Sequence, residues 1–200
     1  LMGKFSSRRK GFSVLEIGSW LGAGSTQIFA EYADRIVCVD HWEGSDTEEH
    51  RQIISQVDPY SIFQSNIASF EDKVTAVRCD SSRLDEQFED GTFDFIFIDP
   101  LRAVSSLAID ENTAEFGKRV VRPLRKLITE EGGTALLIHH NSRGSGKFAG
   151  SGDIRAAVWG LAALRLVDEN DTSTLHLSTL KAHDGKARDA NPILWRIGRE

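Results

Sequence analysis

Short apolar runs, each closed by a glycine turn or an acidic residue, constrain the fold of this chain most strongly. Four of them stand in the first hundred residues: Ser13–Ile17, Arg35–Val39, Lys73–Arg78 and Phe93–Ile98. Segments with the apolar spacing of helices separate them. Unbroken apolar strands that alternate with helices are typical of a parallel sheet covered on both faces. We therefore predict an α/β fold, a three-layer α/β/α sandwich with a mostly parallel central sheet.

Three helices are predicted between these strands, over Ser25–Ala33, Asp46–Val57 and Tyr60–Phe70. The last two are divided at Asp58-Pro59, because a proline disfavours the helical conformation of the residue before it. In the second hundred residues we expect a helix over Asn112–Glu130 that is kinked or broken at Pro123.

The rest of the second half is less regular. A fifth buried strand is predicted over Thr134–Ile138, and a glycine- and serine-rich loop over Asn141–Asp153. The spacing of Ile154–Leu166 fits a helix, a strand or one of each. Two antiparallel strands are expected near the C-terminus, over Thr174–Leu180 and Ile193–Ile197, joined through a turn at His183-Asp184-Gly185 and lying in the same sheet as the others.

Length and composition fit one globular domain over residues 1–200, with 40% hydrophobic and 27% charged residues. No apolar run approaches the roughly 20 residues of a membrane span, so we expect a soluble, cytoplasmic protein without a membrane partner. The two cysteines, Cys38 and Cys79, lie in apolar runs without metal-ligand spacing and are interpreted as buried thiols. No metal site is predicted.

Charge is divided unevenly along the chain. Residues 1–100 hold 18 acidic and 9 basic residues, whereas residues 101–200 hold 12 acidic and 15 basic ones. The basic excess of the second half is modest, and no basic stripe alternates with aromatic residues, so no nucleic-acid partner is expected. The contrast suggests two halves with different histories, although two ordinary solvated surfaces would explain it equally well.

Residues at the ends of the first strands point to a ligand. The carboxyl ends of parallel strands form the edge at which open α/β folds bind their ligands. The glycines of Gly18–Gly24 would let the backbone approach a ligand, and the helix that follows offers free N–H groups. Asp40 ends the second strand, where a carboxylate can accept hydrogen bonds from ribose hydroxyls. The pattern favours a small-molecule nucleoside ligand.

At these residues the chain resembles a known family. The segments VLEIGSWLG (14–22), VCVD (37–40), HWEGS (41–45) and FDFIFID (93–99) are similar to those of class I S-adenosylmethionine-dependent methyltransferases, over about residues 10–99. The resemblance implies a Rossmann-like front half with S-adenosylmethionine as cofactor. It implies that Glu16 and the backbone of the glycine turn face the methionine part of the cofactor, that Asp40 binds the ribose, and that Asp80 and Ser81 lie near the adenine. The cofactor-binding residues expected on this basis are Glu16, Gly18, Ser19, Gly22, Gly24, Asp40, His41, Asp80, Ser81 and Asp99.

The second half resembles a different family. The segments ALLIHHNSR (135–143), GSGDIRAA (150–157) and LKAHDG (180–185) are similar to RecA-like P-loop ATPases of the hexameric plasmid-replication helicase type, over about residues 93–198. The resemblance implies that Asp99 lies beside magnesium, that His139 or His140 senses the terminal phosphate, and that Lys181, on an exposed turn, acts across a subunit interface.

Phosphate binding in that family needs the motif G-x-x-x-x-G-K-[ST]. The turn Gly18–Thr26 has Ala23-Gly24 where Gly-Lys should stand, and Lys147 is followed by Phe148 instead of a hydroxyl residue. We therefore predict no ATP hydrolysis. A chimera joined near residues 93–100 explains both resemblances, because both families have an apolar strand ending in aspartate there. The chimera would be engineered or recombined.

Two main functions follow from these interpretations, besides a nucleotide-binding oligomer that would rely on Asp99, His140 and Lys181 and is disfavoured by the missing phosphate lysine. A chimera would keep residual S-adenosylmethionine binding with little or no catalysis and no catalytic residue, because acceptor pockets depend on later strands. The alternative is a working small-molecule methyltransferase with a divergent back half, in which His139, His140 or Asp99 acts as a base or metal ligand. The sequence leaves the oligomeric state open.

Overall fold

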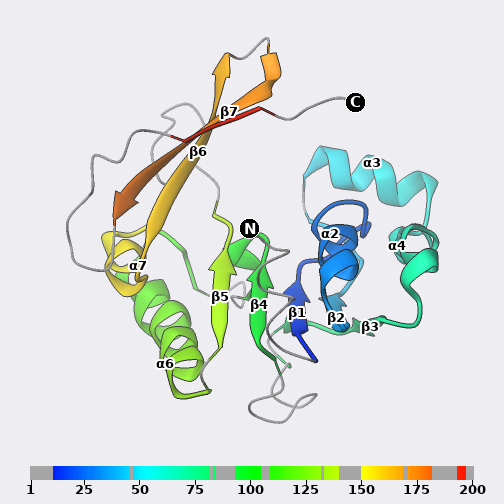
Figure 1. Cartoon of the computed structure of the whole chain (residues 1–200), viewed down its shortest axis with the longest axis horizontal. Coiled ribbons are helices and arrows are strands. Elements are labelled where there is room, and N and C mark those ends of the chain that lie inside the picture. Colours follow the sequence, from blue (N-terminus) through cyan, green and yellow to red (C-terminus); the bar gives the residue numbers. More distant parts are fainter. Residues whose placement is uncertain are drawn as a thin grey trace.

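Five parallel strands form the central sheet of the computed structural model, in the order β3-β2-β1-β4-β5 (Figure 1). The structure describes residues 11–45, 47–81, 83, 93–104, 109–131, 133–139, 150–168, 171–181 and 193–196. The strands of this sheet are β1 (Ser13–Ile17), β2 (Arg35–Asp40), β3 (Val74–Arg78), β4 (Phe95–Ile98) and β5 (Thr134–Leu137). The predicted α/β class and mostly parallel central sheet are confirmed.

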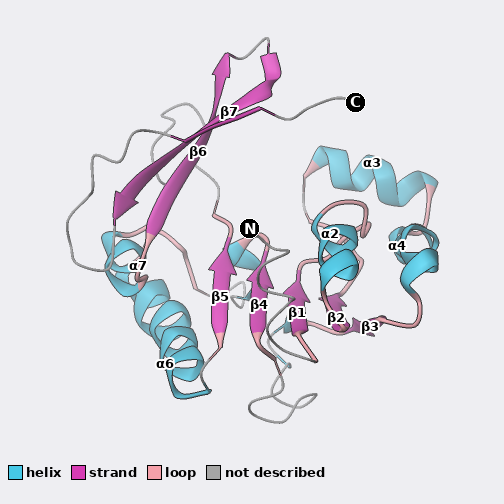
Figure 2. Ribbon diagram, viewed as in Figure 1, coloured by secondary structure: helices cyan, strands magenta, loops and turns pink. Residues whose placement is uncertain are grey.

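Helices cover both faces of the sheet (Figure 2). Successive residues of β1 and β2 point to opposite faces, which sorts them into two apolar clusters. One cluster joins Val14 and Ile36 to Phe29 of α2 (Ser25–Tyr32) and Phe63 of α4 (Pro59–Ile67). The other joins Leu15, Val37 and Ile98 to Leu124 of α6 (Arg122–Glu131). This alternation explains why Val14-Leu15 of β1 and Ile36–Val39 of β2 are apolar on both faces of the sheet.

The predicted division at Asp58-Pro59 is confirmed. The helix α3 (Glu48–Gln56) ends before it, and α4 begins at Pro59. The Asp58 carboxylate caps α4 by accepting hydrogen bonds from the backbone N–H groups of Tyr60 and Ser61. The Ser61 hydroxyl also donates to it, at 2.7 Å, and this bond is the largest cause that lowers the pKa of Asp58. The short helix η1 (Ala68–Phe70) then leads to β3.

The helix expected over residues 112–130 is present as three consecutive parts. These are α5 (Ala114–Phe116), a π-helical turn η4 (Gly117–Val121) and α6. The helix type changes just before Pro123, which has no N–H to donate to the carbonyl four residues earlier. A wider turn at this point leaves room for the proline ring. Pro123 is thus the second residue of α6, and the structure has a change of helix type before it where a kink or break at the proline was expected.

The chain after β5 departs from the prediction. Residues 154–166, whose pattern was ambiguous, contain one helix and one strand: they fall within α7 (Gly152–Ala157) and β6 (Leu161–Asp168). The C-terminal strands do not join the central sheet as expected. They form a separate antiparallel sheet, in which β7 (Asp171–Lys181) lies between β6 and β8 (Ile193–Arg196). Strands that follow one another along the chain can pair directly as antiparallel neighbours, without a crossover to the central sheet.

The β6–β7 hairpin extends away from the carboxyl edge of the central sheet (Figure 1). Of the loop expected over Asn141–Asp153, residues 141–149 lie outside the described residues, and its last two residues, Gly152 and Asp153, instead begin α7. The turn expected at residues 183–185 also lies outside the described residues. Neither Cys38 nor Cys79 forms a disulfide; Cys38 is buried, as expected, whereas Cys79 is half-buried. None of the described helices is long and apolar enough to span a membrane.

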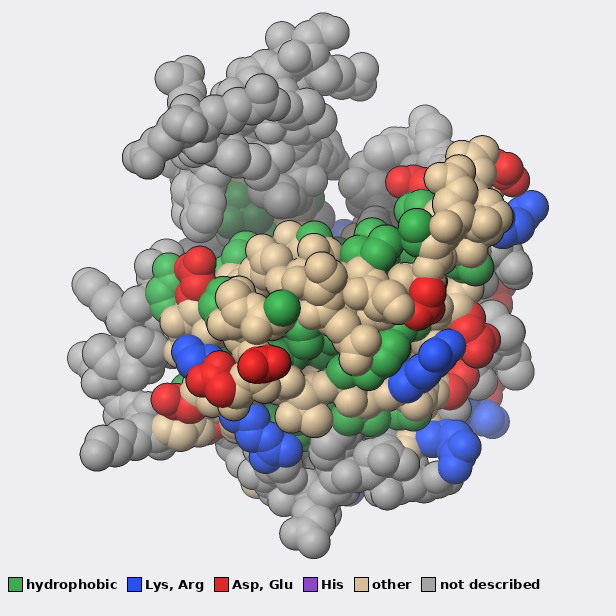
Figure 3. All heavy atoms as spheres, turned by 90° about the vertical axis from the view of Figure 1, so that its right-hand side faces the viewer, with side chains coloured by type: hydrophobic (Ala, Val, Ile, Leu, Met, Phe, Trp, Pro, Cys, Tyr) green, Lys and Arg blue, Asp and Glu red, His purple; other side chains and the backbone are tan. Residues whose placement is uncertain are grey.

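Seen from the side of α3, α4 and β3, acidic and basic side chains are interspersed with apolar ones (Figure 3).

Two isoleucines test the packing of this core. Ile36 of β2 is fully buried, whereas Ile28 of α2 is 52% exposed. We expect Ile36→Ala to lower the free energy of unfolding by about 2–5 kcal/mol, because it removes buried apolar contacts and leaves a cavity. The matched change Ile28→Ala should alter it by less than about 0.5 kcal/mol. Urea unfolding followed by circular dichroism measures both values, and equal losses would contradict the assigned core.

Candidate cofactor site

The glycine turn that follows β1, residues 18–24, is fixed by the conformations of its glycines. Gly18 has φ +88° and donates its N–H to the Val39 carbonyl at 2.9 Å. Gly22 has φ +67°, and a Cβ placed there would lie 2.7 Å from Cδ2 of Phe63. Gly22 therefore meets two requirements: a left-handed backbone and a close approach to α4. Gly24 precedes α2 and gives that helix no side-chain cap.

The carboxylate of Asp40 ties this turn to the loop that follows β2. One oxygen accepts the backbone N–H of Trp20 at 2.9 Å, and the other accepts that of Trp42 at 2.7 Å. Both tryptophans have positive φ, +46° and +55°, which is uncommon for bulky residues. The Trp42 indole N–H also donates to the Trp20 carbonyl, at 2.6 Å. The turn and the acid that ends β2 therefore form one hydrogen-bonded unit at the carboxyl edge of the sheet.

Glu16 is turned into the protein. Its side chain is fully buried and accepts hydrogen bonds from the hydroxyls of Ser25 and Thr26, both at 2.5 Å, and from the Cys38 thiol at 3.4 Å. Burial, followed by the nearby Glu16 carboxylate, raises the pKa of Cys38 well above the ordinary thiol range. Glu16, which the resemblance places toward the methionine part of the cofactor, thus binds the first turn of α2 through these two hydroxyls.

Ser19 and His41 flank this unit. Ser19 is 7% exposed, and its hydroxyl lies 3.5 Å from the Glu16 carbonyl. His41 is exposed, and its Nδ1 accepts the Glu43 N–H at 2.8 Å and lies 3.8 Å from the Asp40 carboxylate. These two expected residues therefore lie next to Glu16 and Asp40, one buried and one at the surface.

The remaining expected residues follow β3 and β4 at the same edge. Asp80 is exposed and Ser81 half-buried, just after the end of β3. The Cys79 N–H before them donates to the Asp40 carbonyl at 3.1 Å, which links the end of β3 to β2. Asp99 is half-buried after β4, and its N–H donates to the Ile17 carbonyl at 3.0 Å. The strand-end acids therefore lie along one edge, as the sequence predicted.

Residues singled out in the second half lie on other elements. His139 follows β5, and its Nε2 would lie 3.1 Å from a Cβ placed on Gly150. Lys181 was expected on a turn, but it is the last residue of β7 and is opposite Leu161 of β6. His140 lies outside the described residues. Among the described residues, no group of three or more His, Cys, Asp or Glu is placed to hold a metal ion.

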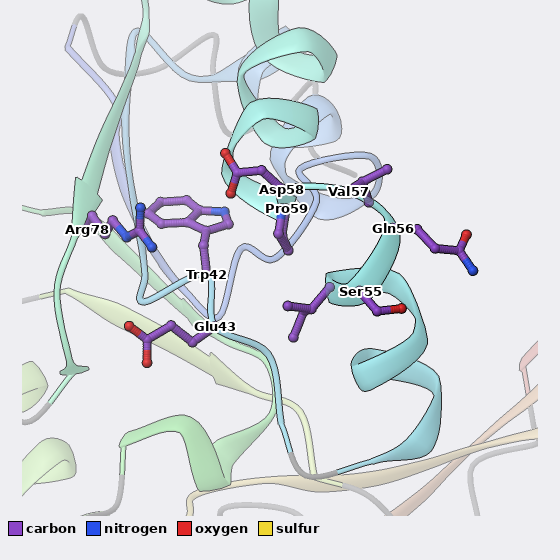
Figure 4. A pocket seen from close by; sticks show the side chains of 9 residues that line it. Trp42, Glu43, Ser55, Gln56, Val57, Asp58, Pro59 and Arg78 are labelled. Atoms are coloured by element: carbon purple, nitrogen blue, oxygen red, sulfur yellow. The ribbon is translucent and has the colours of Figure 1, made fainter.

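A cavity of about 490 Å³ opens beside this unit, between the ends of β2 and β3 and the junction of α3 with α4 (Figure 4). None of the expected cofactor residues lines it. No sequence motif signals it, because its walls come from three separate segments. Its lining residues are Trp42, Glu43, Ile54, Ser55, Gln56, Val57, Asp58, Pro59 and Arg78.

A sequence profile described as "Methyltransferase domain" matches residues 15–122, more than half of the chain. The chain belongs to this methyltransferase family. The match begins in β1 and includes the glycine turn, Asp40, Asp80 and Asp99, so the resemblance of the first half is confirmed at the level of the family. It supports cofactor binding of the S-adenosylmethionine type and does not by itself assign any residue a role.

The methyltransferase match continues past the expected joining point at residues 93–100 and through α5 and η4. The family profile gives no support for a P-loop ATPase half. The RecA-like half and the chimera therefore have no support.

A search of curated proteins finds no match. Among solved structures, the chain is similar to phosphoethanolamine N-methyltransferase 1 of Haemonchus contortus, in a structure with phosphoethanolamine and S-adenosylhomocysteine. The two share 16% identity with a TM-score of 0.37, over 62% of this chain and 22% of that one. The chain thus corresponds to less than a quarter of the length of that enzyme.

Replacement of Gly22 tests the geometry of the turn. Gly22→Ala should lower the free energy of unfolding by about 2–4 kcal/mol, because it adds a clash with Phe63 to a left-handed backbone. The matched control is Gly152→Ala, at the first residue of α7, where a Cβ meets no atom within 4 Å. We expect this control to be neutral or stabilising by up to about 1 kcal/mol. Guanidinium unfolding measures both changes, and similar values would contradict the geometry of the turn.

Proposed function

We propose that the chain binds S-adenosylmethionine at the carboxyl ends of β1 and β2 and transfers its methyl group to an acceptor at the ends of β4 and β5. The observation that carries this proposal is the bonding of the Asp40 carboxylate to the backbone of the glycine turn. This bonding joins the two features that a nucleoside cofactor needs, a backbone it can approach closely and an acid for its ribose. The family match supports the same class of cofactor.

The residues at this edge fit such a cofactor. Each oxygen of Asp40 accepts one backbone N–H and keeps a second lone pair that can accept a ribose hydroxyl. His41 lies beside it, and Asp80 and Ser81 provide polar groups for the adenine at the end of β3. The backbone of Gly18, Ser19, Gly22 and Gly24 would face the methionine part. Glu16 would support this arrangement through its bonds to Ser25 and Thr26, in the first turn of α2.

The acceptor is assigned to the other end of the same edge. Asp99 and His139 follow neighbouring strands, because Ile98 of β4 is opposite Leu137 of β5. A carboxylate or an imidazole can take a proton from an acceptor hydroxyl or amine, which increases its nucleophilicity. When bound, S-adenosylmethionine supplies an electrophilic methyl group. The role of this protein would be to place the acceptor in line with that group, and orientation of this kind is worth about 7–11 kcal/mol of the barrier.

A second candidate function is cofactor binding with little or no methyl transfer. It is favoured by the hydrogen bonds of Asp40 to the backbone of Trp20 and Trp42, which organise the cofactor edge without any group at the ends of β4 and β5. The two candidates differ in turnover. Release of S-adenosylhomocysteine that increases with a panel of hydroxyl and amine acceptors supports methyl transfer. Saturable cofactor binding without release supports the second candidate.

The role of Asp40 can be measured with two ligands. We expect S-adenosylhomocysteine to bind about 10- to 100-fold more tightly than its 2′,3′-dideoxy analogue, because a hydrogen bond to a charged group contributes about 1.5–3 kcal/mol. In Asp40→Asn this ratio should fall to within about threefold of unity. Calorimetric titration gives the four dissociation constants. Because the ratio compares two ligands on one protein, it separates ribose recognition from the effect of the substitution on the turn.

The matched control for Asp40→Asn is Glu43→Gln, which neutralises a neighbouring acid on the same loop. The Glu43 side chain lines the cavity and is not among the residues expected to bind the cofactor. This change should leave the ratio of the two affinities as it is in the unmodified protein. If Asp40→Asn also leaves the ratio unchanged, Asp40 does not belong to the ribose site.

A further inference from the structure

The helix α3 is attached to the rest of the protein through few of its residues. Within α3 only His50 and Ile53 are half-buried, and no residue is fully buried. Figure 1 shows α3 at the end of the molecule toward which the central strands point. The contacts of His50 therefore determine how this helix lies against the carboxyl edge.

The imidazole of His50 stacks on the indole of Trp20. Their ring centroids are 4.4 Å apart and their planes differ by 20°. The imidazole is also held from its other end, because Nδ1 accepts the Ser45 N–H at 2.9 Å and lies 2.9 Å from the Ser45 hydroxyl. The His50 ring is thus fixed by the loop before α3 and presented flat to the glycine turn.

Gly44 makes this close arrangement possible. It has φ +71°, and a Cβ placed there would lie 2.7 Å from Cδ1 of Ile54. The same Cβ would lie 3.2 Å from Cβ of His50 and 3.2 Å from Cη2 of Trp20. No larger residue fits between the loop, α3 and the indole unless one of them moves.

Trp20 is the residue of the turn that most needs support. Its left-handed backbone, φ +46°, is a sparsely populated conformation that persists only when the surroundings determine it. Two of its supports act on the backbone, the Asp40 carboxylate and the Trp42 indole. The stack with His50 acts on its side chain.

We infer that His50 is a positioning residue of the cofactor site: by stacking on Trp20 it holds the glycine turn in the shape that receives the nucleoside cofactor. This inference rests on the proposed function. It adds that α3, which contributes none of the expected cofactor residues, influences cofactor affinity through one ring-to-ring contact. His50 acts through Trp20 and has no contact with the reacting atoms.

The test compares two substitutions at one position. His50→Ala removes the ring, and we expect it to weaken S-adenosylhomocysteine binding about threefold to tenfold, the effect of losing one aromatic pair. His50→Phe keeps a flat ring but loses the bonds to Ser45, so its affinity should lie between those of His50→Ala and the unmodified protein. Arg51→Ala is the control, because Arg51 is exposed and forms an ion pair with Glu48 on the same helix. It should have no effect.

A second readout needs no ligand. Backbone hydrogen exchange at residues 20–22 should be faster in His50→Ala than in His50→Phe and unchanged in Arg51→Ala, because the turn opens more often without the stack. Gly44→Ala, which strains the left-handed loop and crowds Cβ of His50 and Cη2 of Trp20 while leaving both rings present, should reproduce the faster exchange.

These outcomes separate the inference from the proposed function. If the unmodified protein binds no S-adenosylhomocysteine, the proposed function fails, and the exchange measurement still decides whether His50 positions the turn. Unchanged exchange and unchanged affinity in a folded His50→Ala would overturn the inference. A His50→Phe variant as impaired as His50→Ala would also overturn it, because the ring contact would then not be the cause.

Discussion

The two hydrogen bonds accepted by the Asp40 carboxylate hold the functional edge of this protein together. They fix the backbone of Trp20 and Trp42 in left-handed conformations that these residues rarely adopt alone. Hydrogen bonds to an ionised acceptor are roughly twice as strong as those between neutral groups, so the bonds can offset this cost. The backbone carbonyl of Asp40 also accepts the Cys79 N–H, which brings the end of β3 to the same residue.

Glu16 and Asp40 show how position separates the roles of two carboxylates on neighbouring strands. Asp40 ends β2 and accepts bonds from two loops, with its side chain 10% exposed. Glu16 lies within β1, fully buried, and accepts bonds from the first turn of α2 and from Cys38 of β2. Asp40 thus organises the backbone at the carboxyl edge of the sheet, and Glu16 organises the first turn of α2. Both act before any ligand is present.

Much of the central sheet could be predicted because its signals are local. Each strand of the first half is an apolar run with a terminal acid or glycine, and Asp58-Pro59 divides α3 from α4 by chemistry confined to those residues. The separate C-terminal sheet could not be predicted, because strand spacing does not say which sheet a strand joins. The sequence similarity of the second half to RecA-like ATPases was likewise a poor guide, since short strand-and-turn segments recur in many α/β folds.

The sequence predicted which strand ends form the site, but it did not predict the contacts that the residues there make. The positions of Asp40, Asp80 and Asp99 at strand ends follow from the parallel sheet. The inward turn of Glu16 depends on hydroxyls at Ser25 and Thr26, nine and ten residues away, and the pattern of a single strand does not show them. The stack between Trp20 and His50 depends on the path of the intervening chain, which Gly44 and Asp40 set together.

The pairing of β1 with β4 also has a consequence for how the chain acquires its shape. Ser13, at the start of β1, donates its N–H and its hydroxyl to the Asp94 carboxylate, 81 residues further along, so the centre of the sheet depends on distant partners. At about 5–20 residues per second, translation needs roughly 4–16 s to supply that partner after β1 is made. During this interval β2 is the one sheet neighbour that β1 can have, and its other edge is open to association with neighbouring chains. The hairpin of β6 and β7, in contrast, can close as soon as its second strand is synthesised.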